Sequence, residues 1–430
     1  MLQNSIDKKF LGTTKSRSQP KFIQSILEID WILIFLSVGL TAIGTVGIRS
    51  TEMKIPDSET WFQHGLFGAI GLLLAFTILR SNYQNLLRWK WLIYGVTNIS
   101  LLAVMLIGTK ALGAQRWITI GGFNIQPSEF AKLGVIITLA ALLEEHTAEK
   151  LPAIVKSLSI VAVPWILVFL QPDLGTSLVF GAVSMGMLYW GNAKLGWLVL
   201  LVSPLVSAIL FGVYFPAWLI WVNVMGVVAW LNLPWRWIGS LVATAVNVAC
   251  GQLGQTLWGL LKDYQKDRLI LFLAPEKDPL GGGYHLIQSR IAIGSGEMWG
   301  RGLFHGTQTQ GNFIPEQHTD FIFSAIGEEF GFVGAVVVVC LFWLICLRLV
   351  IVASTAADNF GSLLCIGIMS MIVFQVVVNL GMTIGLAPVT GIPLPWMSYG
   401  RSALLTNFLA IGLAGSVSRK RGKKKKRSQS

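Results

Sequence analysis

Long apolar segments separated by short polar ones run through most of the chain. From Trp31 to Val417, about twelve such segments recur, each long enough to cross a hydrocarbon core about 30 Å thick as a helix. They cover residues 30–48, 62–79, 90–108, 127–143, 154–170, 174–190, 194–212, 215–231, 235–257, 321–348, 360–386 and 395–417. The pattern predicts an all-α protein, a polytopic integral membrane helix bundle.

Composition agrees with this prediction and excludes a soluble chain. The sequence is 53% hydrophobic and only 13% charged, which is typical of a membrane protein. The first apolar run follows a polar, lysine-bearing N-terminal stretch and has no small-residue cleavage site, so we expect it to be retained as a span. The cysteines form no CxxC pair and lie inside apolar runs, which favours packing over metal binding; they are Cys250, Cys340, Cys346 and Cys365.

Charge indicates how the chain is oriented. Most of the net charge of +12 lies in the first 30 residues and in the tail 418–430, which argues against a nucleic-acid surface and predicts a positive-inside signal. Short basic loops fall on the same side as both tails; they contain Arg80, Arg88, Lys90, Lys194, Arg236 and Arg348. We therefore expect both termini in the cytoplasm. The basic tail is either simply solvated or contacts anionic lipid headgroups.

Three regions follow from this topology. Residues 1–29 form a cytoplasmic basic tail, 30–417 the transmembrane domain and 418–430 a second cytoplasmic tail rich in Lys and Arg. An even number of spans places the large hydrophilic loop 258–319 on the outer face. Its many glycines allow tight turns and close approach to a ligand, but neither GxxxxGK[ST] nor GxGxxG is present, which excludes the usual nucleotide-phosphate loops.

An acid and a base share one face of the fourth predicted span. Glu129 and Lys132 are three residues apart, and pairing is the least costly arrangement for two charges within a bilayer. Such a pair is either a structural clamp or part of a site.

Cations near the outer ends of spans are candidates for anion binding. Arg116 lies in GAQRW, and Lys266 and Arg268 lie in DYQKDR. Several such groups around one cavity would suit a diphosphate. Each could instead be an interfacial residue that extends its charge to water.

The segment PEQHTD, residues 315–320, leads into the tenth predicted span. Asp320 is expected in the first turn of that helix, where burial and helix dipoles act in opposite directions on its carboxylate. It is either a base or, like Thr319, a helix cap. Capping also explains Asp173, which precedes another span.

Six motifs in order resemble the SEDS family of bacterial cell-wall proteins, more its elongation branch than its septation branch. They are GAQRWI, QPSEFAK, QPDLGTSL, DPLGGGYHLIQSRIAIGSG, GTQTQGNFIPEQHTDFIFSAIGEEFGFVG and NLGMTIGLAPVTGIPLPWMSYG. The resemblance implies a peptidoglycan glycosyltransferase of the bacterial cytoplasmic membrane. Such an enzyme polymerises lipid II into β-1,4 strands at the outer face and works with a class B penicillin-binding protein, a transpeptidase, in elongation and rod shape.

The resemblance also implies roles for single residues. Asp320 becomes the general base, and Glu129, Lys132 and Arg116 become substrate contacts. With these we group the remaining candidates for substrate binding, which are Lys266, Arg268, Glu316, His318 and Thr319.

The chain departs from the family pattern in two places. The family has ten spans, whereas this chain carries an additional hydrophobic hairpin at about 215–257. Where the family usually shows SYGGS, this chain reads SYGRS, so Arg401 places a cation at the start of the last span. Arg401 could reach the interface, pair with an acid or contact phosphate.

The expected leaving group decides what chemistry the site needs. Lipid II leaves as undecaprenyl pyrophosphate, which needs positive charge and no protonation, so one carboxylate is enough to deprotonate the acceptor. No cofactor is certain, although a divalent cation, Mg or Mn, is compatible. The alternatives are a lipid II flippase, in which polar residues such as Asn379 would line a path, and a noncatalytic scaffold, in which Asp320 would be dispensable.

Overall fold

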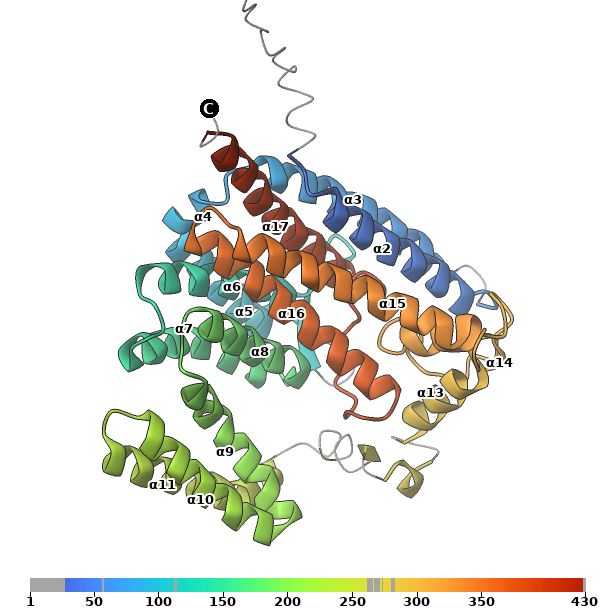
Figure 1. Ribbon diagram of the computed structural model, residues 1–430. Helices are drawn as coiled ribbons and strands as arrows, with labels where there is room; N and C mark the ends of the chain where they lie inside the picture. Colours follow the sequence, from blue (N-terminus) through green and yellow to red (C-terminus); the bar gives the residue numbers. More distant parts are fainter. Residues whose placement is uncertain are drawn as a thin grey trace, which may run out of the picture.

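The computed structural model describes residues 28–55, 58–111, 114–260, 266, 271–272, 274–279 and 283–427. Within them the chain is a bundle of long helices with one small sheet (Figure 1). The first half contains α2 (Trp31–Thr51), α3 (Thr60–Arg80), α4 (Asn85–Arg88), α5 (Lys90–Ile107), α6 (Pro127–Glu145), α7 (Leu151–Leu170) and α8 (Leu174–Trp190). The second half contains α9 (Leu195–Val213), α10 (Phe215–Asn232), α11 (Arg236–Leu260), η1 (Pro275–Lys277), α13 (Tyr284–Ser295), α14 (Thr307–Gln310), α15 (Ile322–Ser354), α16 (Asn359–Thr383) and α17 (Arg401–Arg427).

Every predicted apolar segment contains a long helix. Among the described residues, nine helices are long and apolar enough to cross a membrane, and α8 falls short of that only in length. The chain is therefore a multi-pass membrane protein. The predicted start of the last span at residue 395 was wrong, because α17 begins at Arg401. Pro393 and Pro395 precede it and cannot donate a helical hydrogen bond.

Helix α6 lies at the centre of the main bundle. It packs against α5, α7, α8, α16 and α17, and its side chains are buried from Pro127 to Leu143 except for Phe130. A helix that is buried on all sides faces protein rather than lipid. Charged residues on α6 therefore meet other side chains, which is the condition for placing an ion pair inside a membrane protein.

The two described chain ends meet at one end of the bundle. Asp30, just before α2, forms an ion pair of 2.9 Å with Arg348 and accepts a hydrogen bond of 3.0 Å from Ser418 of α17. Near them, the buried Tyr83 hydroxyl donates to Asp358 at 2.9 Å; burial, followed by the bond to Asp358 and its charge, raises the pKa of Tyr83 above its usual range. These contacts bring the described beginning and end of the chain to the same end of the bundle.

A three-stranded antiparallel sheet joins α5 to α6 and was not predicted. Its strands are β1 (Thr109–Ala111), β2 (Ala114–Ile120) and β3 (Phe123–Ile125), in that order. Ile120 pairs with Phe123, so Gly121 and Gly122 form a two-residue turn with φ of 57° and 81°. Positive φ at both positions defines a type I′ turn, which glycine adopts without strain. The all-α prediction therefore holds for the bundle but missed this sheet.

Helix α15 is interrupted at Gly331, which has φ 64° and ψ −163°. Residues 296–302 pack onto this break: Arg301 and Gly302 donate to the carbonyls of Glu328 and Glu329 at 2.9 and 3.0 Å. Phe332 and Val333, in turn, donate to Glu297 and Met298 at 2.9 and 3.1 Å. Backbone groups freed by the break are thus satisfied, as a membrane requires. Gly296 and Gly300 allow this approach, because a side chain at either would collide with the α15 backbone.

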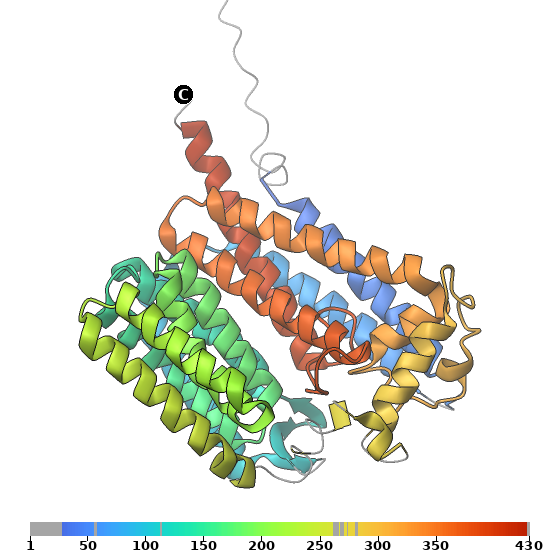
Figure 2. The same cartoon turned by 60° about the horizontal axis from the view of Figure 1, so that its bottom comes forward.

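Helices α10 and α11 correspond to the predicted additional hairpin. They pack against each other and against α9, and both Figure 1 and Figure 2 show the three helices to one side of the main bundle. Asn247 of α11 donates to Ser203 at 3.0 Å, and Ser207 donates to the Asn247 carbonyl at 2.6 Å. Polar bonds of this kind hold helices together in lipid.

Candidate functional site

Asp320 lies at the end of the bundle where α15 begins, partly buried. It precedes the helix rather than lying in its first turn, as the sequence had suggested: α15 starts at Ile322 and Phe321 occupies the N-cap position. No side chain forms the cap hydrogen bond at this position. Neither Asp320 nor Thr319 therefore occupies the N-cap position of α15.

Asn379 of α16 fixes the backbone at Asp320. Its amide nitrogen donates to the Asp320 carbonyl at 2.9 Å and to the Ile392 carbonyl at 2.8 Å. Asn379 is fully buried, so these bonds compete with no water and hold two remote segments in register. From the sequence, Asn379 was considered only in the flippase alternative, as a polar residue that would line a transport path.

Gly391 lies directly opposite the Asp320 carboxylate. A Cβ at this position would lie 3.5 Å from Asp320 Oδ2, and the residue has φ 73°. Only glycine adopts this conformation readily, so residue 391 places no side chain of its own against the carboxylate. On the other side of this loop, Gly175 of α8 comes so close that a Cβ would lie 2.8 Å from the Thr390 carbonyl.

The residues before Asp320 form a compact turn. Glu316 has φ 52°, and its carbonyl accepts from the backbone nitrogens of Thr319 and Phe321 at 3.2 and 3.3 Å. The Thr319 hydroxyl donates to the Glu316 carboxylate at 3.0 Å. The His318 carbonyl accepts from the Tyr399 backbone nitrogen at 2.9 Å. Of the predicted substrate contacts here, Glu316 and Thr319 therefore already bond to each other.

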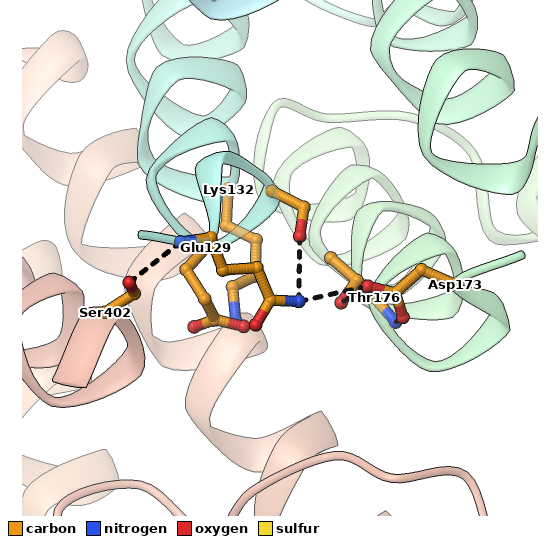
Figure 3. A network of polar contacts seen from close by, with 7 residues as sticks. Glu129, Lys132, Asp173, Thr176 and Ser402 are labelled. Carbon is orange, nitrogen blue, oxygen red and sulfur yellow. Dashed lines mark hydrogen bonds and ion pairs between the residues drawn. The ribbon is translucent and has the colours of Figure 1, made fainter. Parts of the chain in front are cut away.

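A polar network joins the starts of α6, α8 and α17 (Figure 3). The Gln126 backbone nitrogen donates to Ser402 at 3.0 Å, and the Gln126 side chain donates to Asp173 at 3.2 Å. Asp173 caps α8 by accepting from the Thr176 backbone nitrogen at 3.2 Å. The capping interpretation of Asp173 is thus confirmed. Gln126 was missed, although its place before the helix-starting Pro127 was a signal.

Glu129 and Lys132 form the predicted ion pair at 2.8 Å, beside this network (Figure 3). Their side chains are only 4% and 2% exposed. At such burial either charge alone would be very costly, so the two residues stabilise each other. The pair lies within the first two turns of α6, the helix that begins directly after Gln126.

The predicted cations fall in different places. Arg116 lies on β2, where its guanidinium donates to the Pro172 carbonyl just before α8, while its buried Nε has no hydrogen-bond partner. Lys266 is described without its sequence neighbours, and Arg268 lies outside the described residues. The structure therefore brings Arg116 to the start of α8 but does not place Arg268.

A chain of hydrogen bonds links the starts of four helices to the segment of Asp320. The bonds above connect the starts of α6, α8 and α17, and Tyr399 and Asn379 connect this group to the start of α15. Helix N-termini carry partial positive charge and unpaired backbone nitrogens. The start of α8 is already capped by Asp173 and the first turn of α6 carries Glu129, whereas α15 and α17 have no acidic residue in their first turns. The starts of α15 and α17 are therefore the ones that favour an anion near the Asp320 carboxylate, which suits a base acting next to a phosphorylated group.

The described residues contain no group of three or more His, Cys, Asp or Glu side chains that could hold a metal ion. The carboxylate of Asp320 is one oxygen donor, and Mg²⁺ is commonly held by one or two carboxylates together with substrate phosphates. A divalent ion at this site would thus need phosphate oxygens from the substrate to complete its ligands.

A family model described as "Cell cycle protein", for FtsW, RodA and SpoVE, matches residues 27–223 and 216–423. The chain belongs to the FtsW/RodA/SpoVE family. It is 34% identical over 428 residues to the peptidoglycan glycosyltransferase RodA of Treponema pallidum, covering 92% of this chain and 98% of the relative. It is 36% identical over 357 residues to the peptidoglycan glycosyltransferase MrdB of Escherichia coli, covering 81% and 83%. The resemblance to the SEDS proteins is confirmed.

Two solved structures share the fold. One, described as structural coordination of polymerization and crosslinking by a peptidoglycan synthase complex, aligns with a TM-score of 0.68 at 29% identity, covering 91% of this chain and 98% of the other. The rod shape determining protein RodA of Thermus thermophilus aligns with a TM-score of 0.60 at 26% identity, covering 91% and 97%. The helix arrangement around Asp320 therefore belongs to a fold that this family shares.

Proposed function

We propose that the chain is a peptidoglycan glycosyltransferase that polymerises lipid II at the outer face of the bacterial cytoplasmic membrane, in cell elongation. Its relatives carry that enzymatic name. The observation that carries the assignment of the site is the position of Asp320. Its carboxylate faces Gly391, its backbone is held by Asn379, and hydrogen bonds link its segment to the starts of α6, α8 and α17.

In this proposal Asp320 acts as the general base. The 4-hydroxyl of the acceptor sugar attacks the anomeric carbon of the lipid-linked donor, and its proton passes to the Asp320 carboxylate. The bond from the anomeric carbon to the diphosphate oxygen breaks, and undecaprenyl pyrophosphate leaves. A single displacement inverts the α-linked donor to a β-1,4 linkage.

The leaving diphosphate needs positive charge rather than an acid. The starts of α15 and α17 and the Arg116 guanidinium supply it from the protein. A divalent cation, Mg or Mn, held by the diphosphate would add to it. Lys132 is already neutralised by Glu129, so we assign that pair to holding the start of α6 beside the site.

The partners follow from the same reaction. A class B penicillin-binding protein would crosslink the strands, in keeping with the peptidoglycan synthase complex that this fold resembles. The bilayer would hold the polyprenyl chains of donor and product. With the glycosyl transfer outside, the end of the bundle at Asp320 faces outward and the two chain ends face the cytoplasm.

Replacing Asp320 by Asn tests the assignment. The change keeps the shape of the side chain and removes its basicity, so we expect glycan synthesis from labelled lipid II to fall at least about 100-fold, while binding to the transpeptidase partner is unchanged. Glu297→Gln, an exposed carboxylate beside the α15 break, is the matched control and should keep full activity. Glycan ladders from Asp320→Asn within a few-fold of the wild-type rate would overturn the assignment.

A further inference from the structure

Arg401, the first residue of α17, packs against two aromatic rings from other elements. Its guanidinium carbon lies 5.6 Å from the ring centroid of Phe67 on α3 and 5.6 Å from that of Phe123 on β3. The two rings are themselves 6.3 Å apart. The three groups therefore form a triangle in which one cation attracts both rings.

The edge of the same guanidinium forms a closed set of hydrogen bonds. Arg401 Nη2 donates to Gln63 Oε1 at 2.6 Å, and Arg401 Nε donates to the Tyr399 hydroxyl at 3.2 Å. The Tyr399 hydroxyl donates in turn to Gln63 Oε1 at 2.8 Å. Because the guanidinium is planar with donors in fixed directions, these bonds and ring contacts define its orientation completely.

These contacts join the parts of the site. Tyr399 donates from its backbone to His318, two residues before Asp320, and its ring lies 5.9 Å from the His318 ring. Phe123 belongs to β3, which pairs with β2, the strand that carries Arg116. Gln63 and Phe67 lie near the start of α3. Arg401 thus contacts the sheet of Arg116 and the wall of the bundle directly, and the segment of Asp320 through Tyr399.

We propose that Arg401 is a positioning residue that holds the Arg116 sheet and the Asp320 segment in a fixed relative position. The inference rests on the function proposed above, because positioning matters only if Asp320 and Arg116 act on one substrate. Two of the three guanidinium nitrogens are engaged within the protein, which favours a structural clasp over a direct phosphate contact. A misplacement of about 1 Å can cost about 100-fold in rate.

Arg401→Lys separates these two roles. Lysine keeps the charge but not the planar fork, so a clasp fails while a simple charge contact largely survives. With partner and labelled lipid II, we expect kcat to fall about 10-fold or more with KM within about 2-fold. Gln63→Leu should have a similar effect, and the double variant should be no worse than Arg401→Lys. Arg88→Lys, exposed near the opposite end, is the control.

A second measurement tests the positioning role of Arg401 without an activity assay. In a protein without its four native cysteines, spin labels at Asn124 of β3 and at the exposed Leu73 of α3 report the distance between sheet and bundle. We expect a narrow distance distribution in the wild type and a broad one in Arg401→Lys. An unchanged distribution would overturn the proposal, as would a raised KM with kcat intact. An inactive wild type would refute the proposed function instead. The spin-label distances would still show whether Arg401 holds the sheet in a fixed position relative to the bundle.

Discussion

The Asn379 side-chain amide donates a hydrogen bond of 2.9 Å to the backbone carbonyl of Asp320, 59 positions away in the sequence. The same nitrogen donates a second bond, of 2.8 Å, to the backbone carbonyl of Ile392. The side chain therefore sets where the Asp320 carboxylate lies relative to the loop that faces it. Both bonds join the amide to backbone carbonyls and involve no ionisable side chain, so Asn379 contributes only by positioning the backbone.

Asn379→Leu should lower kcat by about 10- to 100-fold while KM changes little, because two buried carbonyls lose their donor and Asp320 shifts. Gln375→Leu, another fully buried amide one turn away on α16, should keep most of the activity. The rates are measured with lipid II and the partner enzyme. Equal losses in the two variants would show that α16 tolerates no apolar residue here and that Asn379 has no special role.

The Glu129–Lys132 pair should be strongly coupled. Glu129→Gln or Lys132→Met alone leaves a buried charge and should cost about 3 kcal/mol or more of unfolding free energy, whereas the double variant should cost less than the sum. The measurement is a double-mutant cycle on unfolding in detergent. The pair Lys90–Glu145, with side chains 11% and 46% exposed, serves as the control cycle and should couple by at most about 1 kcal/mol. Additive losses at Glu129 and Lys132 would contradict the buried pair.

Gly331→Ala should disrupt the break in α15. At φ 64° and ψ −163° an alanine is strained, and its Cβ would lie 2.7 Å from the Met298 carbonyl oxygen. We expect a lower melting temperature and faster proteolysis of the segment 296–302. Gly294→Ala in α13, with no atom within 4 Å of the added methyl, should leave stability unchanged or slightly raised. A stable Gly331→Ala variant would mean that the break does not depend on glycine.

The orientation in the membrane can be tested with single cysteines in a protein without native ones. A cysteine at Asn124, exposed at the Asp320 end, should react with a membrane-impermeant maleimide in intact cells. One at Lys194, exposed between α8 and α9 at the other end, should react only after permeabilisation. The reverse pattern would place Asp320 in the cytoplasm and refute the proposed reaction with an external substrate.

The hydrophobic pattern alone determined the helices, since each apolar stretch from Trp31 to Val417 must satisfy its backbone internally in lipid. The pairing of Glu129 with Lys132 also followed from sequence, because residues three apart share a helix face and a lone charge is costly there. Asp173 as a cap was likewise local, a matter of residue type and position before a helix. Such inferences need only neighbouring residues and the solvent.

Only the tertiary structure decided what surrounds Asp320. The bond from Asn379, the approach of Gly391 and the contacts of Arg401 with Gln63 and Phe123 all join residues far apart in the chain. No local pattern encodes which loop a helix start will face, because that depends on how the whole bundle packs. The short sheet and the glycine at the α15 break were missed for the same reason: their backbone partners lie in other segments, and hydrophobic periodicity does not record them.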